Sequence, residues 1–210
     1  MVITYMGGEC FKVSQGDLTI ALNPPSKDSK LKTSKFGSDI VLTSINHEDM
    51  NGIENASFGD REPFSIVGPG EYEVKGVAVR GFAGESQYDG KKSINTIYSI
   101  ALEGMNLCFL GALGSTELPH AAMQELDDID ILFLPVGGEG VLDHDAAYKL
   151  AVQLEPKAII PMHYGTLGGK DALKAFLKEA GSESVAPADK LTVKKKDLDG
   201  KEGEIVVLTS

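Results

Sequence analysis

Residues 39–49 read Asp39-Ile40-Val41-Leu42-Thr43-Ser44-Ile45-Asn46-His47-Glu48-Asp49. The apolar run at 40–42, flanked by polar residues, is typical of a short strand buried on both faces of a sheet. This strand is expected to deliver the chain into Ser44–Gly52, a polar segment that carries the first candidate functional residues. A strand buried on both faces needs neighbours on each side, and the flanking sequence predicts them.

Further strands are predicted on both sides of this segment, separated by glycine turns and polar loops. The connection from Asn23 to Ser38 is rich in lysine, serine and proline, which indicates a surface loop. The expected strands are Val2–Met6, Phe11–Val13, Leu18–Leu22, Phe64–Val67, Val77–Phe82, Asn95–Glu103 and Leu107–Leu110.

After residue 115 the pattern changes to alternating helices and strands. Strands are expected at Ile129–Val136 and Ala158–Met162, and a hairpin is expected from Leu191–Lys195 and Glu204–Leu208. The order of the elements predicts a layered α/β fold, with sheet inside and helices outside, formed by a single domain over residues 1–210. The expected helices are Thr116–Leu126 with Ser115 or Thr116 as N-cap, a helix capped by Asp143 with Ala147, Leu150, Ala151 and Leu154 on its apolar face, and Asp171–Ala180.

The composition predicts a protein that binds neither nucleic acid nor membranes. The 210 residues include 31 acidic and 20 basic side chains, and the net charge of -11 repels phosphate backbones and anionic lipid. The basic run Lys194-Lys195-Lys196 is expected at a solvated hairpin edge. Cys10 and Cys108 are too few for a disulfide framework, and residues 1–5 lack the features of a signal peptide, so a cytoplasmic location is predicted.

Four short strings point to one family. Met6-Gly7-Gly8-Glu9-Cys10-Phe11 resembles the LGHSCF opening of a metallo-β-lactamase subgroup that includes the ascorbate-phosphate lactonase-like hydrolases. Gly68-Pro69-Gly70-Glu71-Tyr72-Glu73-Val74 resembles its GPGEYEV turn, while Leu134-Pro135-Val136-Gly137-Gly138 and Ile160-Pro161-Met162-His163-Tyr164 resemble its LPVGG and IPMHY strings. The strings follow the family's order, so the resemblance implies a metallo-β-lactamase-like αββα sandwich.

The resemblance implies hydrolysis at two adjacent metal ions, usually zinc, which lower the pKa of a bound water. The central motif of the family is H-x-H-x-D-H. In this chain Ile45 stands at the first histidine and Met50 at the last, so His47 and Asp49 remain from the motif.

Other ligand positions that the resemblance implies also hold different residues. His163 of the IPMHY string is retained, whereas the stretch Ala83–Asp89, where a further histidine is expected, has none. The remaining positions, which are histidines or the bridging aspartate in the family, hold Gly8, Phe109, Ala112 and Ser115.

These replacements predict a dismantled metal site. We expect Ile45, Met50, Phe109 and Ala112 to pack together beside the surviving residues, because well-packed apolar groups can replace a buried charged cluster without loss of stability. The pattern therefore predicts a pseudoenzyme without a bound cofactor, with a binding or scaffold role and a small-molecule ligand. A homo-oligomer is left open.

The alternative is a weak one-metal hydrolase. Zinc at partial occupancy would be held by His47, Asp49 and His163, with Asp49 as the candidate catalytic residue and Glu48 or Glu85 as a helper. Its substrate would be a lactone or a phosphoester-type small molecule. A metal-independent enzyme that uses other residues is the third possibility.

The same residues also have structural interpretations. His47 and Asp49 lie two positions apart and can hydrogen-bond within their loop, and His163 can be a hydrogen-bonded residue at a strand end. Cys10 and Cys108 are expected as small buried residues rather than nucleophiles. A serine triad through Ser44 or Ser115 lacks the sequence of a nucleophile elbow.

Overall fold

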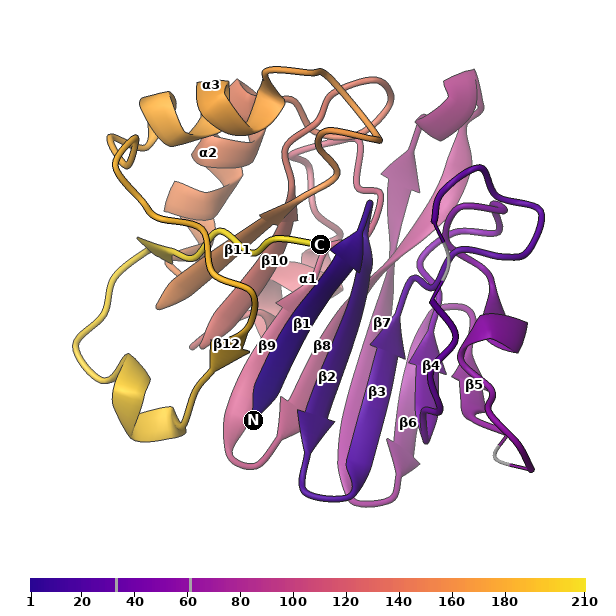
Figure 1. Cartoon of the computed structure of the whole chain (residues 1–210). Coiled ribbons are helices and arrows are strands. Elements are labelled where there is room, and N and C mark those ends of the chain that lie inside the picture. Colours follow the sequence, from indigo (N-terminus) through magenta and orange to yellow (C-terminus); the bar gives the residue numbers. More distant parts are fainter. Residues whose placement is uncertain (33, 61) are drawn as a thin grey trace.

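Two β-sheets lie face to face, and α-helices cover the outer surface of one of them (Figure 1). The structure is a computed structural model that describes residues 1–32, 34–60 and 62–210. The layered α/β fold predicted from the sequence is confirmed. Each short apolar run finds a paired neighbour and a buried face in this arrangement.

The first sheet has six strands in the order β12-β1-β2-β3-β4-β5. Neighbours among β1, β2 and β3 are antiparallel, whereas β4 runs parallel to both β3 and β5. The polar segment that follows β4 therefore leaves the sheet at the same end as the connection that follows β3. The strands are β1 Val2–Gly7, β2 Cys10–Gln15, β3 Leu18–Leu22, β4 Ile40–Leu42, β5 Phe64–Ile66 and β12 Leu191–Thr192.

The second sheet has seven strands in the order β13-β11-β10-β9-β8-β7-β6. Strands β9, β10, β11 and β13 are parallel neighbours, so their carboxyl ends meet at one edge of the sheet. The strands are β6 Gly70–Val74, β7 Val77–Ser86, β8 Ser93–Leu102, β9 Met105–Phe109, β10 Ile131–Pro135, β11 Ala158–Met162 and β13 Glu204–Ile205.

The helical layer lies on the second sheet and consists of α1 (His120–Glu125), α2 (His144–Leu154) and α3 (Ala172–Glu179). The Asp143 side chain accepts a hydrogen bond from the Ala146 backbone N–H at 2.9 Å, as expected for the N-cap of α2. In the described ranges, no helix has both the length and the apolar character needed to cross a membrane.

Connections rather than an α-helix cover the outer face of the first sheet within the described chain. Phe36 in the connection before β4, and Ile53 in the 3-10 helix η1 (Ile53–Asn55) after β4, pack against Ala21 and Val41 of the sheet. The 3-10 helices η2 (Tyr88–Gly90) and η3 (Lys195–Leu198) complete the elements.

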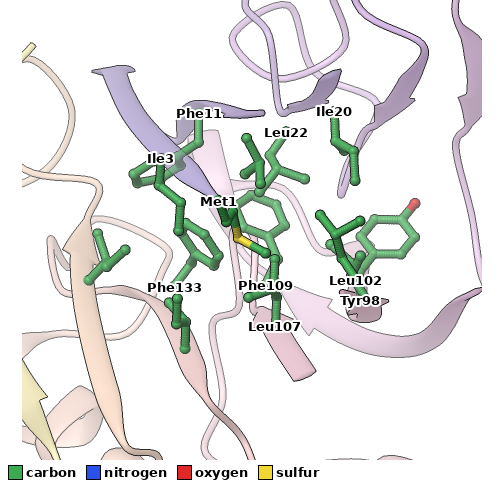
Figure 2. Packing of buried hydrophobic residues seen from close by; sticks show 14 of the residues in the cluster. Met1, Ile3, Phe11, Ile20, Leu22, Tyr98, Leu102, Leu107, Phe109 and Phe133 are labelled. Carbon is green, nitrogen blue, oxygen red and sulfur yellow. The ribbon is translucent and has the colours of Figure 1, made fainter. Parts of the chain in front are cut away.

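The main core fills the space between the two sheets. Phe133 packs edge-on against Phe11 and Phe109, with ring centroids 4.8 and 5.9 Å apart. Figure 2 shows Ile3 and Phe11 of the first sheet directed toward Phe109 and Phe133 of the second. Each large apolar side chain buried here stabilises the fold by roughly 1.5–3 kcal/mol, so the sandwich is a firm support for the loops at its end.

The predicted C-terminal hairpin is wrong. Strand β12 pairs with β1 in the first sheet and β13 pairs with β11 in the second, so the two segments belong to different layers. The lysine run between them enters η3 instead of lying on a hairpin edge, and the Lys195 ammonium contacts the buried Asp130 carboxylate at 2.6 Å. Each segment joins the edge of a different sheet instead of pairing with the other segment across a local turn.

Two other boundaries differ from the prediction. The first helix begins at His120 rather than Thr116, with Pro119 at the N-cap, because a proline ring disfavours helical geometry in the residue before it. The segment Gly68–Val74, which resembles the GPGEYEV turn, contains strand β6 (Gly70–Val74), which pairs with β7 at the end of the second sheet.

Candidate functional site

Loops from both sheets converge at one end of the sandwich. Ser44 follows β4 of the first sheet, whereas Gly111, Gly137 and His163 follow the parallel strands β9, β10 and β11 of the second. Glu9 lies in the turn between β1 and β2 and reaches the same place. Strand ends of this kind are where α/β proteins place their functional groups.

A buried acid–imidazole pair lies at the centre of this region. Oε1 of Glu9 lies 2.6 Å from Nδ1 of His163, and both side chains have no exposed surface. Oε2 of Glu9 accepts a hydrogen bond from Asn23 at 2.7 Å, and the same Asn23 amide donates to Ser44 at 2.8 Å. The Glu9 carboxylate, the His163 imidazole and the Asn23 amide therefore form one buried polar network.

The backbone fixes His163 in an uncommon conformation. Its φ angle is 61°, in the left-handed region that a non-glycine residue rarely adopts, and its N–H donates to the Gly8 carbonyl at 2.8 Å. A Cβ atom on Gly137 would lie 1.9 Å from the His163 carbonyl oxygen, so glycine is required there. The strain and the close approach hold the imidazole in one place.

Asp49 is held by other protein groups. One carboxylate oxygen accepts from the Ser29 hydroxyl and the other accepts from the Tyr88 hydroxyl at 2.7 Å. The Asp49 backbone N–H donates to Nδ1 of His47 at 3.2 Å, so the pair is hydrogen-bonded within its loop. His47 and Asp49 therefore make the hydrogen bonds within their loop that the structural interpretation of the sequence expects.

Tyr88 connects the two histidines. Its ring packs edge-to-face against His47, with centroids 4.8 Å apart, and against His163, with centroids 5.3 Å apart. Burial and the hydrogen bond to Asp49 raise the pKa of the Tyr88 phenol above its ordinary range, so the phenol stays neutral and acts as a donor.

Apolar residues fill the space beside Tyr88. Ile45, Met50 and Ala112 form a buried cluster with Val141, against which Tyr88 and Leu167 pack. The expected convergence holds for these three replacements but is wrong for Phe109. Phe109 points into the core between the sheets and packs on Phe133, because side chains alternate between the two faces along β9.

The glycine at the LGHSCF histidine position is also enclosed by apolar groups. Gly8 has a φ angle of 62°, and a Cβ atom there would lie 3.1 Å from side-chain atoms of both Leu31 and Leu167. A larger side chain at this position would therefore have to displace two leucines.

Other residues singled out from the sequence lie outside this constellation or act structurally. Glu85 is exposed and pairs with Lys92 at 2.9 Å. The Ser44 hydroxyl accepts from Asn23, and its neighbours do not include an imidazole among the described hydrogen bonds. Both cysteines are buried, and burial raises the pKa of the Cys10 thiol to about 12, so neither is an activated nucleophile.

An open groove of about 1380 Å³ lies next to the buried pair. Its lining includes His47, Glu48, Asp49, Tyr88 and Leu167, whereas His163 lies beneath it without exposed surface. The groove is larger than the roughly 300–1,000 Å³ of common small-molecule pockets, so a small molecule would fill part of it.

The residues that would hold zinc do not fit a metal ion as they are folded. Both carboxylate oxygens of Asp49 have hydroxyl donors, and an apolar cluster fills the space beside Tyr88. Across the described residues, no three His, Cys, Asp or Glu side chains group in a way that could hold a metal.

Sequence reasoning missed Glu9, Asn23 and Tyr88. Glu9 stands at the serine of the LGHSCF string, and Tyr88 lies in the stretch where a histidine was sought. The available signals were the acidic Glu9 beside Gly8, where the family has a histidine, and the aromatic Tyr88 within Ala83–Asp89. Neither is a metal-ligand pattern, so a search for ligands passes over both.

Comparisons with known proteins agree with the fold. A family model described as the beta-lactamase superfamily domain matches residues 2–163. A UPF0173 metal-dependent hydrolase of Natranaerobius thermophilus is 27% identical over 187 residues, which cover 79% of this chain and 84% of that protein. A relative of the same description from Thermoplasma acidophilum is 24% identical, with 88% of this chain and 94% of that protein covered.

The solved structures give the same result. A candidate Zn-dependent hydrolase of the metallo-β-lactamase superfamily from Thermotoga maritima superimposes with a TM-score of 0.72 and 28% identity, over 99% of this chain and 97% of that one. Igni18, a metallo hydrolase from Ignicoccus hospitalis, superimposes with a TM-score of 0.66 at 21% identity, over 92% of this chain and 99% of that one, which indicates a shared fold.

Proposed function

This chain belongs to the beta-lactamase superfamily domain family, whose relatives here are named metal-dependent hydrolases, and we propose that it binds a small molecule without metal-dependent hydrolysis. The single observation that carries the proposal is that the Asp49 carboxylate is already occupied by protein donors. Its two oxygens accept from the Ser29 and Tyr88 hydroxyls, and no three His, Cys, Asp or Glu side chains of the described residues group so as to hold a metal.

The energetics support this proposal. A metal ion would have to replace the Tyr88–Asp49 hydrogen bond and recruit His47 and His163, which both pack against the Tyr88 ring. It would also lie against the apolar cluster of Ile45 and its neighbours, where a charge without ligands is costly. A neutral small molecule brings no charge to this cluster.

The one-metal hydrolase remains the second candidate function because of one atom. Nε2 of His163 is buried and has no hydrogen-bond partner, so it is a nitrogen that a metal could take. The hydrolase would need His47 and Asp49 to turn toward this nitrogen and away from Tyr88.

Metal analysis distinguishes the two functions. Protein purified without chelator is expected to contain well under one zinc per chain, and chelator is expected to move its thermal midpoint by less than about 1 °C. A zinc ion at about 100 times its Kd would instead add roughly 2.7 kcal/mol, and its removal would lower the midpoint by roughly 5–11 °C.

Variants provide the control for that measurement. If zinc is held at this site, His47→Ala and Asp49→Ala lower the zinc content, whereas His120→Ala, at an exposed position, leaves it unchanged. Stoichiometric zinc that responds in this way would overturn the proposal and establish the one-metal hydrolase.

A further inference from the structure

Nε2 of His163 is a buried polar atom without a hydrogen-bond partner. Among the described residues, it and Oδ1 of Asn95 are the buried side-chain atoms without a hydrogen-bond partner. Buried polar atoms are nearly always paired, so an exception calls for a functional explanation. The left-handed backbone at His163 adds a second cost, and strain of this kind gathers at binding sites.

The surrounding network determines which imidazole nitrogen carries the proton. Oδ1 of Asn23 accepts from the Ser44 backbone N–H at 2.7 Å, so the Asn23 NH2 group must face Glu9. Glu9 therefore acts as an acceptor toward Asn23, and a carboxylate is likewise an acceptor toward Nδ1 of His163. A neutral imidazole with its proton on Nδ1 presents a lone pair at Nε2.

Tyr88 contacts both the His163 ring and the groove. The phenol ring packs against the imidazole and also lines the groove, and its hydroxyl is anchored by one hydrogen bond to Asp49. Leu167 and the apolar cluster pack around the same ring. The space that Tyr88 fills is thus bounded by apolar side chains and by the His47 and His163 rings, and the Asp49 carboxylate lies at its hydroxyl end.

We propose that Nε2 of His163, held as an acceptor by Glu9, binds the N–H or O–H group of a flat, neutral small molecule that displaces the Tyr88 ring. The apolar walls accept the body of such a ligand, and the groove accepts any polar extension. This inference rests on the proposed metal-free function, because a metal ion would consume the same lone pair.

The tautomer is tested first, by nitrogen NMR of the imidazoles in the intact protein. The His163 signals, assigned by their loss in His163→Gln, are expected to show protonated Nδ1 and unprotonated Nε2. A protonated Nε2 in the unmodified protein would overturn the inference, because the ligand site would then be a donor.

Glu9→Gln is a matched variant that reverses the tautomer. Because Asn23 presents its NH2 group, the new amide must turn its oxygen to Asn23 and its NH2 group to His163. Nδ1 then accepts and the proton moves to Nε2. Nδ1 that stays protonated in this variant would contradict the proposed network.

Binding is tested with indole and N-methylindole, which have similar shape but differ in the N–H donor. Tyr88→Ala, with its folding checked by thermal unfolding, removes the blocking ring and is expected to bind indole about fivefold more tightly than N-methylindole. The preference should disappear when Glu9→Gln is added. In the unmodified protein both probes should bind more weakly, with the same preference and with a shift of the His163 signals.

Equal affinities for the two probes in Tyr88→Ala would overturn the role of Nε2. Absence of binding to the unmodified protein would overturn displacement of Tyr88. Metal analysis of the same samples separates the two proposals: bound zinc refutes the metal-free function, whereas zinc-free protein without the indole preference refutes the inference alone.

Discussion

Glu9→Ala tests the buried network most directly. The substitution leaves the His163 Nδ1–H and one Asn23 N–H without an acceptor in the interior. Each buried unsatisfied donor costs about 1–3 kcal/mol, so two such donors cost about 2–6 kcal/mol. We expect a loss of about 2–6 kcal/mol, a large share of the roughly 5–15 kcal/mol that keeps a domain folded.

Urea unfolding measures this loss as the change in midpoint at constant slope. Glu9→Gln should lose much less than Glu9→Ala, because a change of tautomer at His163 satisfies the new amide. Glu85→Ala is the surface control, since its exposed pair with Lys92 should contribute less than about 1 kcal/mol. A Glu9→Ala variant within 1 kcal/mol of the unmodified protein would refute the idea that this carboxylate satisfies the site.

Three further outcomes follow from named contacts. Tyr88→Phe removes the hydroxyl that donates to the loop aspartate at 2.7 Å and should cost about 1–2 kcal/mol in urea unfolding, whereas Tyr148→Phe on α2 should cost less. Asp143→Ala removes a capping hydrogen bond and should lower the thermal midpoint by roughly 2–4 °C, more than Asp171→Ala, whose side chain caps nothing. Burial raises the pKa of Asp130, but hydrogen bonds from two lysines outweigh burial and hold it below the ordinary value. Its stabilisation is therefore present above about pH 4 and lost as the pH falls further, so the difference in unfolding free energy between Asp130→Asn and the unmodified protein should shrink below about pH 4.

The sequence predicted those parts of the fold that local pattern controls. The buried strand at Ile40–Leu42 and the amphipathic helix capped by Asp143 follow from periodicity and capping, and both occur in the structure. The C-terminal hairpin failed because the partner of Leu191–Thr192 is Val2–Ile3, at the other end of the chain. No local signal reports a partner that distant in sequence, and free sheet edges decide the outcome.

In the candidate site, too, the sequence predicted part of the apolar packing but not the polar contacts. The apolar replacements Ile45, Met50 and Ala112 were predicted to pack together, and they do, because hydrophobic residues in adjoining loops have few other places to go. The position of Phe109 depended on strand alternation, which favours the inter-sheet core. Contacts between polar side chains depend on distances that composition and spacing leave undetermined, so the Glu9 network required a structure.

The polar groups of this region form a nearly closed set, and the exception defines the function we propose. The Asp49 carboxylate has the Ser29 and Tyr88 hydroxyls, and Nδ1 of His163 has Glu9. Apolar side chains fill the adjacent volume. Nε2 of His163 and Oδ1 of Asn95 are the buried side-chain atoms of the described residues that lack a partner. If stability were the sole requirement, an apolar residue in place of His163 would avoid the cost of its Nε2 atom. The retained imidazole is therefore best explained by a ligand that supplies the missing donor when Tyr88 moves aside.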